Sequence, residues 1–502
     1  MTSPASAAFT SLHPSSPASG GAAPRHPLAW RPVGMAMAAL ALLLAATSQG
    51  YGYHRDELYF RMLDPAWGYV DQPPLTPLLA HALASVVDEP WFLRVPAMLS
   101  AVATVLVAAL LTREAGGARR AQSLSAWAAA AAAFPMVLGH VLLTASLDLV
   151  AWPLVCLFAI RALLRPDARA WLWVGLVAGV ASYNRLLIAV LLIGVGLGLL
   201  AVGPWRTLRS PWLWAGVVLT GVIALPNVLY QATHAWPQFA MGAALAADNG
   251  GETRVLMWPL LLTLAGPLLV PIWVAGIVSL LRRPPWRSIR LLLVGFAVVL
   301  VFTFVGSAQF YYPLGMVSVL LALGCVPTAD WMRTRGRRWL VWIAVALNGV
   351  VSALIALPLV PVAAVGATPI PSINQATADS VGWPEYVRQV AAVTPAGVPV
   401  ITSNYGEAGA IARFGPALGL RAVYSDHNEL WYHGHPPDTA DSAVFVGYRA
   451  EPLESLFASC TVRARLDNGV GVDNEEQHLP VTVCTGRRVA WADAWPRFAH
   501  LD

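Results

Sequence analysis

Long apolar runs dominate the pattern of hydrophobic and polar positions over the first 361 residues. A helix needs roughly 20 apolar residues to cross the hydrocarbon core of a bilayer, and inside lipid it satisfies its own backbone hydrogen bonds. The pattern predicts a polytopic α-helical membrane protein with about eleven transmembrane helices, two of them short. They are expected at residues 29–49, 92–112, 121–139, 147–163, 171–183, 186–203, 211–230, 256–281, 290–305, 312–328 and 339–361.

The pattern changes after residue 361. Residues 371–502 contain no apolar run of membrane length, and strand-like pieces alternate there with helix-like pieces. Because a period of two indicates strands and a period near 3.6 indicates helices, we predict a small α/β domain over residues 362–502. The expected strands are 398–403, 421–424, 443–447, 461–466 and 481–485, and the expected helices are 384–393, 407–415 and 451–458.

Charge predicts how the helices are oriented. Only 12% of the residues are charged, against roughly 25% in soluble domains, and cytoplasmic loops of membrane proteins are enriched in basic residues. If the N-terminus is cytoplasmic, every second loop carries an arginine cluster and the acids fall in the opposite loops, which makes the C-terminal domain extracytoplasmic. The clusters are Arg113, Arg119 and Arg120; Arg161, Arg165 and Arg169; Arg206 and Arg209; Arg282, Arg283, Arg287 and Arg290; and Arg333, Arg335, Arg337 and Arg338.

The N-terminal segment, residues 1–27, is rich in Ser, Ala, Pro and Gly and predicts a disordered cytoplasmic tail. The apolar run after it lacks a clear small-residue cleavage site, so we expect a retained anchor helix rather than a removed signal peptide. Residues 28–361 then form the transmembrane domain of a plasma (inner) membrane protein. The formal charge of +5 is spread over short clusters and forms no basic patch, which argues against nucleic acid as a partner and for membrane lipids.

The two cysteines of the extracytoplasmic domain are candidates for a disulfide. Cys460 and Cys484 flank two late strands, and an oxidising compartment would allow them to pair. The alternative is two buried free thiols.

The first outer loop, about residues 51–91, holds the most concentrated candidate chemistry. It carries "YGYHRDELYF", with His54, Arg55, Asp56 and Glu57 in a row, and later "VDQPPL". Ionisable residues at membrane depth are costly and are functional by default, whereas the alternative is a solvated loop. Asp148, in "LLTASLDLVAWPL", is a second acid on the same outer side and a second candidate for function. The alternative is a helix N-cap or first-turn acid, because carboxylates favour that position. Two acids facing one outer cleft indicate an acid/base or cation-handling site.

Other polar residues fall on the same outer side. Asn184 and Arg185 lie at an outer turn, where an arginine can bind an anion bidentately or extend to lipid headgroups. Tyr311 and Tyr312, at another outer turn, either belong to the site or form part of an interfacial aromatic belt. Arg254 has the same two interpretations as Arg185. We also count six residues of the first loop as substrate-binding candidates: His54, Arg55, Glu57, Arg61, Asp71 and Gln72.

No metal-ligand spacing of useful specificity is present, and we assign no metal site. His427, His433 and His435 form the one histidine cluster, in "SDHNELWYHGH". Histidine clusters can bind zinc, but a polar loop is the preferred interpretation.

These features together resemble a known family. "RDELYF" followed by "VDQPPL", the second acid at Asp148 and about eleven spans are similar to the GT-C glycosyltransferases of the protein O-mannosyltransferase and aminoarabinose transferase group, nearest to the bacterial family 39 proteins. The phrases "VGWPEYVRQV", "SNYGEAGAIARFGP", "DNGVGVDNEEQ" and "WADAWPRFAH" extend the resemblance over residues 29–502.

The resemblance implies transfer of a sugar from a polyprenyl-phosphate donor to an acceptor hydroxyl at the outer membrane face, with inversion. Asp56 would be the general base, Asp148 would bind donor or acceptor sugar, and the acceptor would be a glycan, a lipid or a protein. No resident cofactor is implied beyond this lipid-linked donor, and dependence on a divalent metal is left open. The alternative function is a transporter or lipid-handling protein without transfer chemistry.

Two positions depart from the family pattern. Gln72 replaces a basic residue of related aminoarabinose transferases, and Gln309 stands where many relatives have a lysine. Both changes remove positive charge near the expected phosphate. Arg185, Arg61 or Arg254 would then have to supply it.

Overall fold

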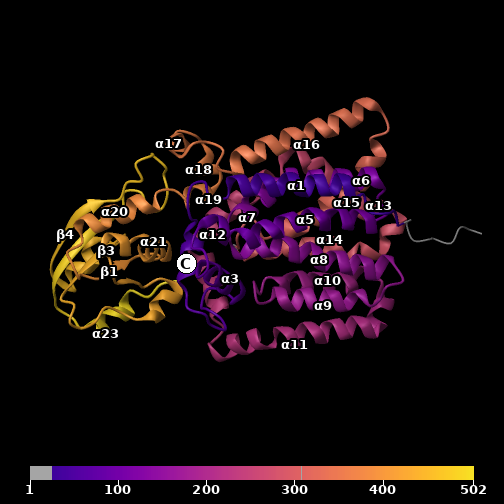
Figure 1. The fold of residues 1–502 in the computed structure, drawn as a ribbon. Helices are drawn as coiled ribbons and strands as arrows, with labels where there is room; N and C mark the ends of the chain where they lie inside the picture. The colour runs from indigo at the N-terminus through magenta and orange to yellow at the C-terminus, as the bar shows by residue number, and fades with distance from the viewer. Residues whose placement is uncertain (1–24, 307, 502) are drawn as a thin grey trace, which may run out of the picture.

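The computed structural model describes residues 25–306 and 308–501, except for the side chains of residues 248–250, 252, 253, 450 and 452. Residues 1–24 of the predicted tail lie outside this range. A long bundle of helices carries a small sheet domain at one end (Figure 1). The N-terminal end of the first helix lies at the opposite end of the bundle from that domain.

All eleven predicted apolar segments contain helix. The helices are α1 (Trp30–Thr47), α5 (Val95–Glu114), α6 (Arg119–Ala131), α7 (Ala133–His140), α8 (Thr144–Leu164), α9 (Ala170–Ala181), α10 (Ile188–Val202), α11 (Pro211–Thr233), α12 (Pro237–Ala265), α13 (Val270–Arg282), α14 (Leu291–Val305), α15 (Leu314–Trp331) and α16 (Arg335–Ala356). The protein is therefore the polytopic helical membrane protein that the sequence predicted.

The predicted count of about eleven spans is not confirmed. Among the described residues, six helices are long and apolar enough to cross a membrane, or eight if each of two bent pairs is one span. The pairs are α6 with α7, bent by 53°, and the end of α12 with the segment through α13, bent by 77°. The remaining expected spans fall on α9, α10 and α14, which are shorter than the roughly 20 residues that a straight crossing needs.

The bend between α6 and α7 follows from the backbone. Pro135 has no N–H to donate to the carbonyl of Ala131, so a continuous helix would leave this carbonyl without its usual partner. The Asn348 side chain of α16 donates to that carbonyl at 2.9 Å. Non-helical backbone at membrane depth is tolerated where protein groups satisfy it in this way.

The predicted start of the span at residues 256–281 was wrong. The sequence predicted a loop between the spans at 211–230 and 256–281, whereas α12 begins at Pro237 and runs to Ala265. Proline is favoured at the first position of a helix, and the following "FAMGAALAA" is rich in the helix former alanine. The predicted apolar run is therefore only the second half of a longer helix.

Helices α13 and α15 cross with their backbones in contact. Gly276 and Gly324 face each other there, and a Cβ on Gly324 would overlap the carbonyl oxygen of Ile272. Small residues at such crossings let membrane helices pack closely where lipid gives no hydrophobic driving force.

The C-terminal domain has a five-stranded sheet with the order β2-β1-β3-β5-β4. Its strands are β1 (Val400–Thr402), β2 (Val423–Ser425), β3 (Ser442–Val446), β4 (Phe457–Arg465) and β5 (Pro480–Arg487). β1 pairs in parallel with β2 and β3, and β5 pairs antiparallel with β3 and β4. All five overlap the predicted strands, although β4 begins four residues earlier than expected. Cys460 and Cys484 are opposite each other on β4 and β5 and form a disulfide.

Short helices lead from the bundle to this sheet or lie between and after its strands. They are α17 (Val362–Val365), α18 (Ile370–Ile373), α19 (Gln375–Ala378), α20 (Trp383–Val393), α21 (Tyr405–Phe414), α22 (Ala450–Glu454) and α23 (Trp491–Ala494). The predicted helix at 451–458 is shorter than expected, because β4 already begins at Phe457.

We expect Gly324→Ala to lower the midpoint of thermal unfolding of the purified protein in detergent. The added methyl group would force α13 and α15 apart, and overpacking of this kind costs about 1–3 kcal/mol. Gly221→Ala is the matched control, because a Cβ at Gly221 of α11 meets nothing within 4 Å. Equal midpoints for the two variants would contradict the close crossing.

Candidate active site

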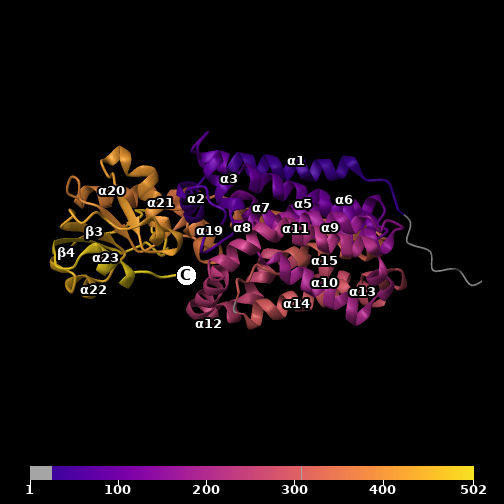
Figure 2. The ribbon, with the colours of Figure 1, turned by 90° about the horizontal axis from the view of Figure 1, so that it is seen from below.

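The first outer loop folds into short helices that pack under the C-terminal domain. They are α2 (Arg55–Met62), α3 (Leu75–Ala84) and α4 (Pro90–Leu93). α2 lies against α21 of the C-terminal domain (Figure 2). Gly409 of α21 permits this contact, because a Cβ there would come within 2.6 Å of the Leu58 backbone. The quoted "RDELYF" is therefore an interdomain helix.

Glu57 fixes the start of α2. Its carboxylate accepts the His54 backbone N–H at 2.9 Å and forms a capping box with the His54 side chain. It is fully buried, and both its oxygens accept from the Arg94 guanidinium at 2.9 Å. The Leu142 backbone N–H, between α7 and α8, also donates to it. Glu57 thus anchors α2 to the membrane helices. We predicted it as a substrate-binding residue, but its side chain is buried inside the protein.

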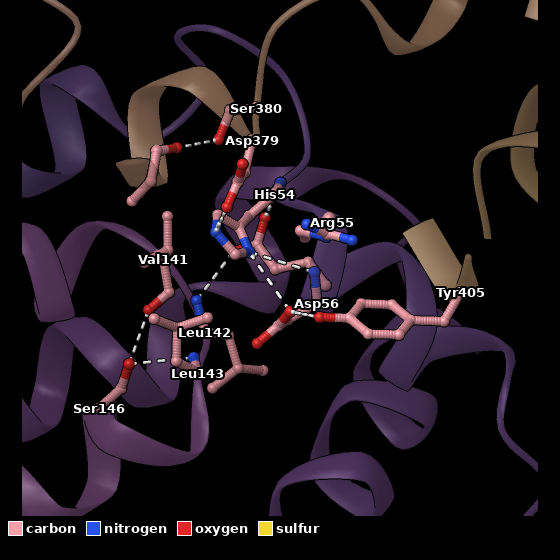
Figure 3. Close-up of polar contacts among 12 residues, drawn as sticks. His54, Arg55, Asp56, Val141, Leu142, Leu143, Ser146, Asp379, Ser380 and Tyr405 are labelled. Atoms are coloured by element: carbon pink, nitrogen blue, oxygen red, sulfur yellow. Dashed lines mark hydrogen bonds and ion pairs between the residues drawn. The ribbon is translucent and has the colours of Figure 1, made fainter. Parts of the chain in front are cut away.

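Asp56, one residue earlier, has the opposite environment. Its side chain is 26% exposed, and its Oδ1 accepts from the Tyr405 hydroxyl of α21 at 3.0 Å (Figure 3). Burial raises the pKa of Asp56, while Arg55, the Tyr405 hydroxyl and Arg185 act in the opposite direction. The carboxylate is held in place and still reaches an open space.

His54 and Arg55 flank this carboxylate. The Nδ1 of His54 accepts from the Asp56 backbone N–H at 3.1 Å, and burial lowers the pKa of His54 to about 3, so the ring is neutral. Arg55 forms an ion pair with Glu475, and its guanidinium lies 4.9 Å from the centre of the Tyr405 ring. The Arg55 guanidinium therefore interacts both with the C-terminal domain and with the groups around Asp56.

The sequence did not identify two residues of the site. Tyr405 lies 349 residues from Asp56, and Asp379, just after α19, lies 3.6 Å from the Nε2 of His54. Burial raises the pKa of Asp379 well above its usual value. Tyr405 occurs in the phrase "SNYGEAGAIARFGP", which served only as a mark of the family, and Asp379 lies two residues before the phrase "VGWPEYVRQV".

A cavity of about 300 Å³ opens beside these groups. We call it the amphipathic cavity, because its lining has two kinds of wall. The polar wall comes from the first loop, the connection between α14 and α15, and the C-terminal segments. It includes His54, Arg55, Asp56, Gln309, Asp379 and Tyr405. The apolar wall comes from α7, α12, α15 and α16 and includes Phe134, Val137, Leu138, Leu260, Leu264, Leu314, Val351 and Ile355. The cavity can hold a molecule with a polar head and an apolar tail.

A second polar cluster adjoins this cavity. Asn184 donates to the Oδ1 of Asp148 at 2.8 Å, and Arg185 lies 3.9 Å from the other Asp148 oxygen and donates to the Tyr312 hydroxyl at 2.7 Å. Tyr311 lines both the small pocket of this cluster and the amphipathic cavity. The structure thus brings Asp148, Asn184, Arg185, Tyr311 and Tyr312 together, and Arg185 is close enough to Asp56 to influence its pKa.

The other predicted residues lie elsewhere. Arg61 is paired with Asp88, to which its Nε donates at 2.8 Å. Arg254 is exposed on α12 and contacts the last carbonyls of α14. Asp71 and Gln72 hydrogen-bond to each other at 3.2 Å, and burial raises the pKa of Asp71 to about 7, with Asp56 a minor contributor. None of the four lines the amphipathic cavity.

The described residues contain no group of three or more His, Cys, Asp or Glu side chains arranged to hold a metal. In the histidine cluster, the His427 ring stacks on the His500 ring, with the centroids 4.5 Å apart, and also lies against Tyr405.

Comparisons with known proteins agree with this architecture. Residues 71–230 match the family model described as dolichyl-phosphate-mannose-protein mannosyltransferase. The fold is similar to that of ArnT from Cupriavidus metallidurans in the apo state, with a TM-score of 0.58 and 16% identity over 93% of this chain and 99% of that chain. It is also similar to the same protein bound to undecaprenyl phosphate, with a TM-score of 0.57 and 16% identity over 89% and 97%.

A search of curated proteins found no match. The family model and the fold nevertheless confirm the resemblance to the mannosyltransferase and aminoarabinose transferase group. The chain has a GT-C fold with a small C-terminal sheet domain.

We expect Glu57→Gln to destabilise the protein strongly. Removing one partner of a buried ion pair costs about 3–5 kcal/mol, because the other charge stays buried. Thermal unfolding in detergent measures the effect. Asp56→Asn, on the same helical turn, is the control and should unfold at or above the wild-type midpoint, since burial disfavours its charge. A Glu57→Gln midpoint equal to the wild type would contradict the anchoring role.

Proposed function

We propose that the protein is a membrane glycosyltransferase that moves a sugar from a polyprenyl-phosphate donor to an acceptor hydroxyl, with inversion. The observation that carries this proposal is the position of Asp56, whose carboxylate meets the polar wall of a cavity with an apolar opposite wall. A lipid-linked sugar has the same division between a polar head and a long apolar chain.

The apolar wall fits the lipid part of such a donor. It consists mainly of aliphatic side chains and Phe134 on four membrane helices, which also contribute Thr263, Asn348 and Ser352 to the lining. The aliphatic side chains offer apolar contacts to a polyprenyl chain. The ArnT structure bound to undecaprenyl phosphate has a similar fold, which supports the same class of ligand here.

Asp56 would act as the general base. The acceptor oxygen attacks the anomeric carbon, its proton passes to the Asp56 carboxylate, and the bond from the anomeric carbon to the phosphate oxygen breaks. Polyprenyl phosphate leaves with the electron pair. A hydroxyl is a weak nucleophile, and a positioned base contributes about 10²–10⁴ in rate. The raised pKa of Asp56 favours this role, because a base works best with a pKa near the operating pH.

Arg185 is our candidate for the residue that binds the donor phosphate. Negative charge builds on the leaving phosphate in the transition state, and fixed donors stabilise it. Of the three arginines that could replace the missing basic residues, Arg61 pairs with Asp88 and Arg254 is exposed outside the cavity. Arg185 is next to the wall that the two pockets share. Asp148, held by Asn184, would orient this arginine and contact the sugar.

We place the reaction at the outer face of the plasma membrane. The domain beside Asp56 and the start of α1 lie at opposite ends of the bundle (Figure 1). Arg25, Arg161 and Arg165 converge on the buried Glu114 at the end of α5, which fits a cytoplasmic end rich in arginine. The acceptor would then be an extracytoplasmic glycan, lipid or protein hydroxyl.

We expect Asp56→Asn to abolish transfer of labelled sugar while donor binding remains. An amide cannot take the proton of the acceptor, so the loss should approach the 10²–10⁴ of general-base catalysis. Transfer and donor binding are measured on the purified protein in lipid nanodiscs. Transfer by Asp56→Asn at the wild-type rate would show that Asp56 is not the base. Transfer lost together with donor binding would instead make Asp56 a binding residue.

We expect Arg185→Gln to weaken binding of a labelled polyprenyl phosphate by about tenfold to a hundredfold. A hydrogen bond to a charged group is worth about 1.5–3 kcal/mol. Arg254→Gln removes the same charge outside the cavity, and its affinity should equal that of the wild type. An affinity loss in Arg254→Gln alone would move the phosphate site to α12.

A further inference from the structure

We propose that Tyr405 is a positioning residue for the catalytic base, so that the C-terminal domain completes the active site. This inference rests on the proposed function and goes beyond it, because it assigns a catalytic duty to a domain outside the membrane helices. It is carried by the direct contact of the Tyr405 hydroxyl with Asp56 at 3.0 Å.

The Tyr405 ring is held from several sides. Its centroid lies 4.7 Å from that of Tyr59 and 4.9 Å from that of His427. The Arg55 guanidinium lies over its face at 4.9 Å, as in a cation–π contact. These neighbours come from both α2 and the C-terminal domain. The hydroxyl therefore has a fixed direction when the two parts are docked.

The backbone of Tyr405 is fixed as well. Tyr405 is the first residue of α21, and its N–H donates to the Nδ1 of His427 at 3.2 Å. Asn404 and Glu407 form a capping box at this helix start. Gly406 and Gly409, one turn apart, let α21 approach Arg55 and Leu58 of α2 closely. The contact with Asp56 is thus built into the domain interface.

The hydroxyl does two things for the carboxylate. It occupies Oδ1, while the other oxygen points away from Tyr405 (Figure 3) and can receive the proton of the acceptor. It also donates to the ionised form, which lowers the pKa of Asp56 against the raising effect of burial. Tyr405 stays protonated, because burial and Asp56 raise its own pKa well above the usual value.

Other charged and titratable groups surround Asp56 and would remain in a variant without this hydroxyl. They come from the first loop, the α9–α10 turn, the segment before α15 and the segment after α19: His54, Arg55, Asp71, Arg185, Tyr311 and Asp379. His54 is neutral. Arg55 and Arg185 still favour the carboxylate, so the base survives without Tyr405 but ionises at a higher pH.

The test is the pH dependence of sugar transfer by Tyr405→Phe. Only the ionised Asp56 accepts a proton, so the rate rises with pH through its pKa. Loss of a donor to the carboxylate raises that pKa. The acid limb of the pH–rate profile, where the rate rises with pH, should therefore shift to higher pH by about one unit. At pH values below this limb, transfer should be roughly tenfold slower than in the wild type. On the plateau, at higher pH, the rate should return to near the wild-type value.

Tyr53→Phe is the matched control. Tyr53 lies at the same interface, with its ring against Phe414 of α21, and its hydroxyl donates to Asp88 rather than to Asp56. Its acid limb should coincide with that of the wild type. A Tyr405→Phe limb at the wild-type pH, with transfer reduced equally at every pH, would overturn the proposal and leave a structural role. Failure of the proposed function itself would show as no sugar transfer by the wild-type protein, and failure of the base assignment would show as transfer persisting in Asp56→Asn.

Discussion

The buried ion pair of Glu57 and Arg94 is the interaction on which the rest of the site depends. Arg94 also donates to the carbonyls of Ser48 and Gly52 just after α1, at 2.6 and 2.7 Å, while Glu57 accepts from the backbone of Leu142. One charge pair therefore joins α1, α2, α5 and the α7–α8 connection. Because each buried charge has a partner and further hydrogen bonds, its desolvation is compensated.

This anchor explains why two neighbouring acids have different roles. Successive residues of a helix point in directions about 100° apart, so when Glu57 is fixed inward, Asp56 must face another way. It faces the amphipathic cavity and α21. Its surroundings then come from distant parts of the chain: membrane helices supply the apolar wall, and the C-terminal domain supplies the hydroxyl that holds the carboxylate.

Much of the architecture could be predicted from the sequence. Apolar runs located the membrane helices, and period-two segments located all five strands of the C-terminal sheet. Asp56 and Asp148 were recognisable because acids beside apolar runs are costly. Bends were harder to predict: Pro135 marks the break after Ala131, but the residue that satisfies the freed carbonyl, Asn348 of α16, has no local signal.

The site could be predicted only in part, for the same reason. Tyr405 and Asp379 join it through docking of a domain some 300 residues later in the chain, and neither has a local signal for this role. Glu57 looked like a substrate ligand because it is an acid beside Asp56, yet its partner Arg94 buries it. Arg61 and Arg254 looked equivalent to Arg185, and their surroundings alone separate them.

The central claim is that Asp56 meets the sugar of a lipid-linked donor at the polar wall of the amphipathic cavity. A structure of the protein in lipid nanodiscs with a bound polyprenyl-phosphate sugar tests it most directly. The account predicts the polyprenyl chain along Phe134, Leu260 and Ile355, the phosphate toward Arg185, and the anomeric carbon facing the Asp56 carboxylate. A donor bound outside this cavity, or with its sugar turned away from Asp56, would contradict it.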